Sequence, residues 1–354
     1  MTGFDQNNAL VKSGNLGFTI ADNEALSKTG NLGPNQGTLI HVDNWGNLNP
    51  AVTPPATPVW TLVSNDSTLD FKALHPTATA FQFVVVGGGG GGHSGAGTQS
   101  IGTQAVLNRS GGTGGGRVSG TIPASMITAA FNFVIGNGGN GGQASIMTSG
   151  AALAAGNAGT AGTNSTISIG ASVLVTALGG KSGVDPTGSG GSFAGGITAT
   201  VNTSTNATTR VIANANEFTT QAIAGGSGGN NAARETNQLV RYTPARGQAN
   251  QAGNFGERGV STSTTSTGNA VAGSNGANGD ITASAVNSLG SGGGGGGTAA
   301  QVGFKGGNGG NGGFPGGAGG AGGHGTYGSA LNGQKVAGDG GNGAKGAIIW
   351  RPVF

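Results

Sequence analysis

Two glycine-rich motifs have the form of phosphate-binding loops. GNGGNG at 136–141 satisfies the G-x-G-x-x-G pattern directly after an apolar run, which is the context of a dinucleotide-binding turn. The acidic residue expected about 20 positions later is missing, since the next one is Asp185. GGKS at 179–182 resembles the end of a P-loop, but Val175 stands where that motif needs a glycine. We therefore expect no nucleotide and no other cofactor.

Residues suited to acid–base, nucleophilic or metal chemistry are few and dispersed. Asp66 and Asp70 flank a strand-like segment and are the nearest approach to a catalytic carboxylate pair. No G-x-S-x-G nucleophile motif occurs, and the absence of cysteine excludes thiolate sites and disulfides. We expect no enzyme and no metal site; a site assembled by folding is the alternative to a solvated loop position for each histidine. The histidines are His41, His75, His93 and His324.

Charge and hydropathy exclude two classes of partner. The 15 basic and 12 acidic residues give a net charge of +3, without the basic stripe of a nucleic-acid-binding surface. No apolar run approaches the roughly 18 residues that a membrane span needs. The N-terminus has no basic stretch followed by an apolar core, so we expect no secretory signal and a protein made in a cytoplasm.

Short apolar strands run directly into glycine blocks. Glycine accounts for 80 of the 354 residues, and FQFVVV at 81–86 is followed by six glycines. FNFVI at 131–135 leads into GNGGNGG in the same way. Helical periodicity is almost absent, which predicts very little α-helix. Further glycine-rich blocks lie at 179–196, 225–229, 290–297, 306–325 and 338–346.

The glycine blocks favour a three-residue repeat over a flexible linker. A polyproline-II-type helix has three residues per turn, so a Gly-Gly-x repeat leaves two bare edges against which neighbouring helices can pack. We expect the six-glycine runs in an inner layer and the Gly-Gly-x runs outside. In 306–325 the side chains of Asn308, Asn311 and Phe314 share one edge, and those of Ala318, Ala321 and His324 the next. A solvated linker is the alternative.

The predicted fold class is all-β or irregular, with packed polyglycine-II helices, short β-strands and a small β-rich N-terminal attachment region. The expected scaffold glycines are Gly87, Gly90, Gly136, Gly139, Gly292, Gly295, Gly306, Gly309, Gly312, Gly319 and Gly322.

An internal repeat sets the N-terminal region apart. ALVKSGNLG at 9–17 recurs as ALSKTGNLG at 25–33, and a third Gly-Asn-Leu follows at 46–48. Repetition at a fixed period predicts repeated β-rich units, with chance similarity as the alternative. The expected attachment residues are Leu16, Leu32, Trp45, Leu48 and Trp60. The predicted division is an attachment region at 1–65, a connector at 66–77 and a glycine-rich domain at 78–354.

The succession FQFVVVGGGGGG, FNFVIGNGGNGG, STISIGASVLVTALGG and GNGAKGAIIW resembles the glycine-rich domain of phage tail-fibre proteins. More specifically, it is similar to the tip adhesins of T-even-type long tail fibres, over residues 78–354. The resemblance implies a rigid stack of polyglycine-II helices whose variable loops, displayed at one end, recognise outer-membrane proteins or surface glycans. It also implies an N-terminal part that docks on other virion proteins, and therefore a virion protein assembled in the host cytoplasm.

The long segments between glycine blocks are the predicted recognition loops. The most distinctive is 230–259, which combines arginines with aromatics, the residue types that dominate binding hot spots. A solvated insertion is the alternative. The loops are expected at 98–110, 143–178, 197–224 and 230–289. The candidate receptor-binding residues are Arg234, Arg241, Tyr242, Arg246, Phe255 and Arg258, with Arg210, Phe218 and Phe193 as secondary candidates.

The expected function is therefore receptor binding on a phage virion, without enzymatic activity or membrane insertion. A structural decoration of the virion, in the fibre or the capsid, is the alternative. Ice binding is only a minor alternative. It needs a flat and regular face of small residues, whereas the edges of 306–325 carry Asn-Asn-Phe and Ala-Ala-His.

Overall fold

The chain divides into two compact units, Met1–Val59 and Trp60–Phe354. In the first unit, β1 (Phe18–Ala21) and β2 (Ala25–Lys28) form an antiparallel pair. Most of the predicted attachment region, with Leu16, Leu32, Trp45 and Leu48, lies outside the described residues. The computed structural model describes residues 18–21, 25–28, 59–98, 109–148, 153–183, 200–201, 223–224, 244–247, 256–262, 268–279, 290–299 and 301–354.

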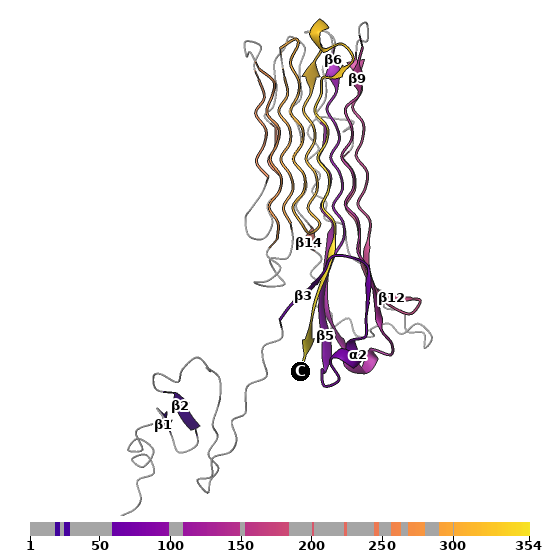
Figure 1. The fold of residues 1–354 in the computed structure, drawn as a ribbon, viewed down its shortest axis with the longest axis vertical. Coiled ribbons are helices and arrows are strands. Elements are labelled where there is room, and N and C mark those ends of the chain that lie inside the picture. The colour runs from indigo at the N-terminus through magenta and orange to yellow at the C-terminus, as the bar shows by residue number, and fades with distance from the viewer. Residues whose placement is uncertain are drawn as a thin grey trace, which may run out of the picture. The chain divides into compact units, whose positions relative to one another are not determined.

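The second unit contains two five-stranded antiparallel sheets, which we call the base (Figure 1). The first base sheet has the order β14-β7-β5-β17-β3 and the second has the order β13-β12-β11-β8-β4. The strands of the first are β3 (Thr61–Val63), β5 (Ala80–Val86), β7 (Gly116–Pro123), β14 (Ile223–Ala224) and β17 (Ala347–Val353). Those of the second are β4 (Ser67–Leu69), β8 (Phe131–Val134), β11 (Ser165–Ile169), β12 (Ser172–Ala177) and β13 (Thr200–Val201).

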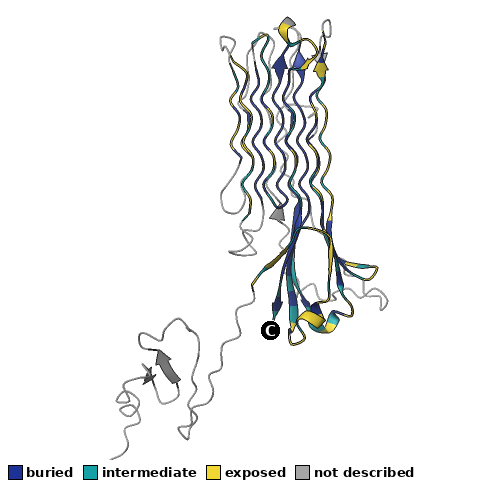
Figure 2. Cartoon of the chain, in the orientation of Figure 1, coloured by how far each residue is buried: buried dark blue, intermediate teal, exposed yellow. Residues whose placement is uncertain are grey.

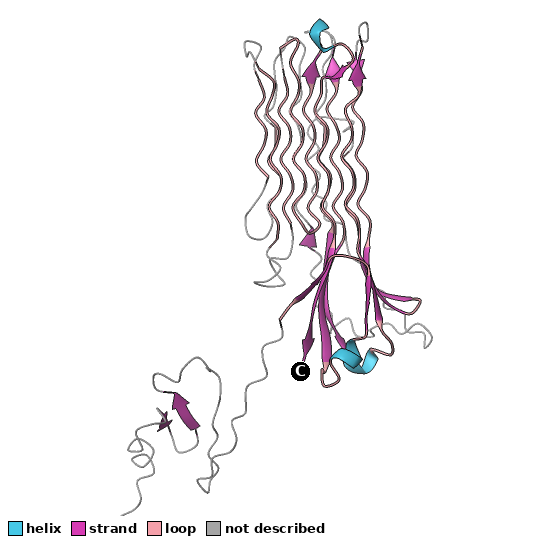
Figure 3. Cartoon of the chain, in the orientation of Figure 1, coloured by secondary structure: helices cyan, strands magenta, loops and turns pink. Residues whose placement is uncertain are grey.

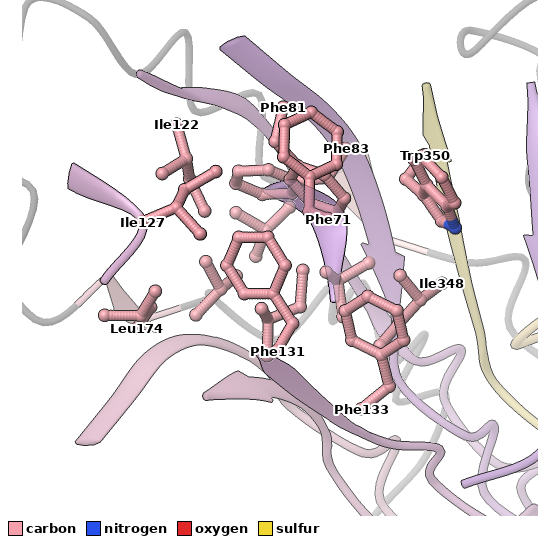
Figure 4. Close-up of a cluster of buried hydrophobic side chains, with 14 of the residues drawn as sticks. Phe71, Phe81, Phe83, Ile122, Ile127, Phe131, Phe133, Leu174, Ile348 and Trp350 are labelled. Carbon is pink, nitrogen blue, oxygen red and sulfur yellow. The ribbon is translucent and has the colours of Figure 1, made fainter. Parts of the chain in front are cut away.

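Alternation along the strands builds the core of the base. In β5, Phe81, Phe83 and Val85 point to one face, and Val84 and Val86 to the other, because side chains alternate along a strand. The first face meets aromatic side chains of the second sheet, so the two sheets share one core (Figure 4). The labelled core residues are Phe71, Phe81, Phe83, Ile122, Ile127, Phe131, Phe133, Leu174, Ile348 and Trp350.

Helix contributes almost nothing to the described residues, as predicted (Figure 3). The α-helix α2 (Phe71–Leu74) is a single turn in which the Asp70 carboxylate accepts from the Ala73 N–H, and it buries Phe71 in the base core. The other helical segments in the part of the chain that the structure describes are the 3₁₀ turns η1 (Ala124–Met126) and η3 (Ser329–Leu331).

Beyond the base, the chain forms extended segments that run side by side (Figure 1). We call them glycine rows and name each by its residues. β5 leads into row 87–95, and row 336–346 leads into β17, so the base and the rows are continuous. The rows are 87–95, 110–116, 136–144, 156–164, 178–183, 244–247, 256–262, 270–279, 290–299, 306–313, 316–325 and 336–346.

Row 87–95 is hydrogen-bonded to six neighbouring rows. Its carbonyl groups accept from rows 136–144, 178–183 and 316–325, and its N–H groups donate to three others in rotation. The donors are Gly87, Gly90 and His93 to row 110–116, Gly88, Gly91 and Ser94 to row 156–164, and Gly89, Gly92 and Gly95 to row 336–346.

The second six-glycine run lies inside in the same way. Row 290–299 is buried throughout and bonds to rows 244–247, 256–262, 270–279, 306–313 and 316–325. The predicted inner position of both six-glycine runs is therefore confirmed (Figure 2).

The glycine content of a row follows its depth. A Cβ added to nearly any row glycine would overlap a backbone carbonyl group of a neighbouring row, so an edge that faces a neighbour must be bare. The six-glycine runs have neighbours on all edges, whereas row 156–164 has one glycine in three. Its glycines, Gly156, Gly159 and Gly162, face inward, and most residues between them are exposed.

This rule corrects two predictions. Parts of the predicted loops at 143–178 and 230–289 are rows 156–164, 256–262 and 270–279, because a single glycine at every third position is enough for an outer row. The Gly-Gly-Ala run of row 316–325 lies inside rather than outside, because alanine methyl groups are small enough to be buried there. The buried side chains on this edge are Ala318, Ala321 and His324.

Candidate functional site

Most of the predicted receptor-binding residues lie outside the described residues. Arg246 and Arg258 are described, and both are exposed on outer rows. The Arg246 Nε lies 2.9 Å from the Glu257 Oε2, and each side chain is 54% exposed. The candidates outside the described residues are Arg234, Arg241, Tyr242, Phe255, Arg210, Phe218 and Phe193.

The direction of the rows locates the two ends of the segment 248–255. Row 256–262 runs away from the base, since Gly256 donates to Gly292 and Thr262 to Thr298. Row 244–247 runs toward the base. Both rows therefore meet this segment at their base-side ends, not at the far end of the rows.

The phosphate-loop motifs are part of the rows. In GNGGNG, the N–H of Gly139 donates to the Gly89 carbonyl, and the N–H of Gly141 donates to the Asn342 Oδ1. In GGKS, the N–H of Gly180 donates to the Gly88 carbonyl. These N–H groups are used within the protein, so they form no cradle for a phosphate.

The two candidate catalytic carboxylates have separate structural roles. The Asp66 Oδ1 accepts a 2.7 Å bond from the Ile135 N–H, where β8 leaves the base. The Asp70 Oδ1 accepts from the Ala73 N–H and caps α2. Neither arrangement is a catalytic pair. Within the described residues, no cluster of histidine and carboxylate side chains suits a metal ion, and no helix is long and apolar enough to cross a membrane.

Short strands close the rows at the end far from the base, and we call this region the distal cap (Figure 1). β6 (Gly97–Thr98) pairs with β10 (Leu153–Ala154) and with β15 (Gly325–Thr326). β9 (Ile146–Met147) pairs with β16 (Gln334–Lys335). A small core beneath them contains Met147, Tyr327 and Val336. The cap is thus a folded surface rather than a set of bare turns.

The distal cap presents an apolar side chain surrounded by polar ones. Ile146 is 60% exposed, and Lys335 lies opposite it in β16. The Lys335 Nζ contacts the Asp339 carboxylate at 3.0 Å and donates to the Gln143 Oε1 at 2.8 Å. Ile146 and these polar side chains therefore lie on one surface of the distal cap. Sequence reasoning missed these residues. The signal that could have found them is the reversal of chain direction between rows that run away from the base and rows that run back toward it.

Two ionisable side chains, His93 and Arg109, are buried near the distal end of the inner rows. Burial lowers the pKa of His93, and the nearby Arg109 guanidinium lowers it further, against the opposing effect of the Ser94 carbonyl. Burial also lowers the pKa of the Arg109 guanidinium. Likewise, His324 is buried, and its Nδ1 accepts from the Ala96 N–H at 2.9 Å. These histidines thus belong to the interior and not to solvated loops.

Asparagine side chains join the outer rows, a feature that the sequence analysis did not predict. The Asn275 Oδ1 accepts from the Asn311 N–H at 2.9 Å, and the Asn311 Oδ1 accepts from the Asn342 N–H at 2.8 Å. The Asn342 Oδ1 then accepts from the Gly141 N–H at 2.8 Å. We call this series the asparagine ladder. It supplies side-chain acceptors to backbone N–H groups of neighbouring surface rows.

Comparison of the sequence with protein-family models and with curated proteins gives no match.

Proposed function

We propose that the second unit is a polyglycine-II lattice that serves as the rigid stalk of a receptor-binding protein on a phage virion. On this proposal the distal cap and the turns beside it contact a protein or glycan of a bacterial surface. The N-terminal region contacts other virion proteins, and the protein has no enzymatic activity and no cofactor. The observation that carries the proposal is the hydrogen bonding of row 87–95 to six neighbours with a period of three residues.

That period supports the polyglycine-II assignment. A helix with three residues per turn directs successive N–H groups about 120° apart, and it has no internal hydrogen bonds. The donors of row 87–95 rotate among three neighbours in this way, and its acceptors serve three more. A sheet strand would instead pair with at most two neighbours.

A rigid stalk also supports a binding role for its far end. Binding residues tend to lie on connections held by a rigid scaffold. The rows flanking 99–108, 149–152 and 263–267 all meet those segments at the distal end. The segment 248–255, within the stretch first expected to bind, joins rows at the other end.

Adsorption competition with matched surface variants tests the proposed role. Ile146 on the distal cap is 60% exposed, and Val260 on the side of a row is 61% exposed. Ile146→Arg should abolish saturable binding of the purified protein to host cells, and Val260→Arg should leave it unchanged. The double variant Arg241→Ala with Tyr242→Ala tests the first-predicted site in the same assay.

Each outcome assigns the function. Loss of binding with Ile146→Arg alone supports the distal cap, and loss only with the double variant moves the site to 230–259. Absence of binding by the folded wild-type protein, together with defects in particle assembly, would instead indicate a structural virion component.

High-resolution diffraction tests the lattice separately. The proposal requires three residues per turn and a rise of about 3.1 Å per residue in the rows. Two-residue alternation at about 3.3–3.4 Å per residue, as in β-strands, would contradict it.

A further inference from the structure

Asn-Gly steps recur along the outer rows. Such steps are prone to deamidation, since the glycine nitrogen can attack the asparagine Cγ without obstruction from a side chain. A C–N bond forms, ammonia leaves, and water opens the cyclic imide to aspartate or isoaspartate. The steps in the described rows are Asn137–Gly138, Asn140–Gly141, Asn275–Gly276, Asn278–Gly279, Asn308–Gly309, Asn311–Gly312 and Asn342–Gly343.

In five of these steps, both the asparagine side-chain oxygen and the N–H of the following glycine are hydrogen-bonded. The Asn275 Oδ1 accepts from the Asn311 N–H, and the following Gly276 N–H donates to the Asn311 carbonyl at 2.7 Å. The carboxamide and the attacking nitrogen are thus both held by one residue of the neighbouring row. At Asn278, Asn308 and Asn311, the asparagine Oδ1 and the following glycine N–H are likewise both hydrogen-bonded to one residue of the neighbouring row. At Asn342, the Oδ1 accepts from the Gly141 N–H, and the Gly343 N–H donates to the Gly139 carbonyl.

Row 136–144 differs. Among the described residues, neither the Asn137 side chain nor the Gly138 N–H has a hydrogen-bond partner, and Asn137 is exposed. Asn140 is intermediate, because only the Gly141 N–H is engaged, by the Asn342 Oδ1 at 2.8 Å.

The two products have different consequences for the rows. Aspartate is compatible with the lattice, since the Asp339 Oδ1 accepts from the Ala144 N–H much as the Asn342 Oδ1 accepts from Gly141. Isoaspartate adds one carbon to the backbone, so every later residue in that row leaves the three-residue register. Isoaspartate is therefore the damaging product.

We propose that Asn137 is a site of spontaneous deamidation in the folded protein, and that the five doubly engaged asparagines are latent sites that react only when the outer rows open. A reaction that requires local opening is slowed by the opening equilibrium. The rows thereby protect most of the labile steps that their own repeat creates.

Peptide mapping by mass spectrometry tests this proposal on the full chain. The protein is incubated in mildly alkaline buffer, folded or unfolded in denaturant, and isoaspartate is quantified with an isoaspartyl methyltransferase. In the folded protein, Asn137 should react about tenfold or more faster than Asn275 and Asn311. In denaturant, the three rates should agree within about threefold, because the protection depends on the fold. Equal rates in the folded protein, or a protected Asn137, would overturn the proposal.

A variant pair tests the role of the hydrogen bond from the Gly141 N–H to the Asn342 Oδ1. Asn342→Ala removes the acceptor of the Gly141 N–H, whereas Asn342→Asp retains an oxygen in the same position. Deamidation of Asn140 should accelerate several-fold in Asn342→Ala and stay at the wild-type rate in Asn342→Asp. An unchanged rate in both variants would show that the hydrogen bond does not protect this step.

Discussion

The base and the glycine rows are stabilised by opposite means. In the base, two sheets bury aromatic side chains against each other, and the ring centroids of Phe81 and Phe131 lie 4.6 Å apart. In the inner rows, most positions have no side chain, and backbone N–H and C=O groups bond laterally to as many as six neighbours. The base therefore depends on large side chains, and the inner rows depend on their absence.

This difference has an energetic reason. Ordering a residue costs about 1–2 kcal/mol of backbone entropy, and glycine is the most costly residue to order. A net hydrogen bond contributes only about 0.5–1.5 kcal/mol, so an isolated row cannot be stable. Rows gain stability collectively, and the base holds the first of them in register. Substitutions in the two regions should consequently have opposite patterns.

One of the two largest effects is expected for Gly91→Ala. The added methyl group would overlap the carbonyl group of Asn140, and the backbone there cannot move without disturbing several rows. We expect a loss at or above the upper end of the ~1–3 kcal/mol typical of overpacking, measured by chemical denaturation. Gly268→Ala is the control, because its Cβ would meet nothing within 4 Å. Equal stability of the two variants would refute close packing of the inner row.

Phe131→Ala reverses the pattern in the base. Phe131 is fully buried between the two sheets, so its removal leaves a cavity that the rigid base cannot fill. The expected loss is about 3–5 kcal/mol in the free energy of unfolding. Phe131→Leu, which fills most of the volume, should recover much of it. A loss below about 1 kcal/mol would show that this core contributes little.

Asn311→Ala tests the asparagine ladder at the edge of the rows. The substitution leaves the Asn342 N–H without its side-chain acceptor, at an exposed position where water can replace it. We expect a loss of about 0.5–1.5 kcal/mol in thermal or chemical unfolding. Asn311→Asp should lose less, because a carboxylate oxygen accepts the same bond. Identical effects of the two variants would argue against the hydrogen bond.

The smallest effect is expected in the dependence of stability on pH. Burial lowers the pKa of His93 below its usual 6.5, so the folded protein favours the neutral ring. Between the lowered pKa and 6.5 the unfolded chain binds more protons, and stability therefore falls as the pH drops through this range. His93→Gln should flatten that part of the stability profile, as measured by denaturation at a series of pH values. A profile of the same slope in this variant would assign the acid sensitivity to another group.

The strand–glycine alternation was readable from the sequence, and the outer rows with one glycine in three were not. FQFVVV and FNFVI alternate as strands should, and both form strands of the base. Row 256–262 escaped recognition because Gly256 and Gly259 are separated by charged residues and resemble a loop. A single glycine in three is a weak signal by itself, and its meaning depends on a neighbouring row that only the fold supplies.

The proposed binding surface on the distal cap was even less accessible to sequence reasoning. Arginine and aromatic content drew attention to 230–259, yet Arg246 pairs with Glu257 along the outer rows. Ile146 and Lys335 are ordinary residues far apart in the sequence, and the pairing of β9 with β16 brings them to one surface.

The sequence by itself determined the period of the rows and the number of bare edges that each row needs. A row with glycine at three, two or one of every three positions has three, two or one bare edges. Each edge that faces a neighbouring row must be bare, because a Cβ there would overlap a carbonyl group of that row. Tertiary structure decided which row lies beside which and whether a Gly-Gly-x run lies inside or outside. Row 316–325 is buried, whereas row 306–313 carries the exposed residues Asn308 and Asn311. The reason is that rows contact each other laterally, and the distance between two rows along the sequence does not indicate whether they become neighbours.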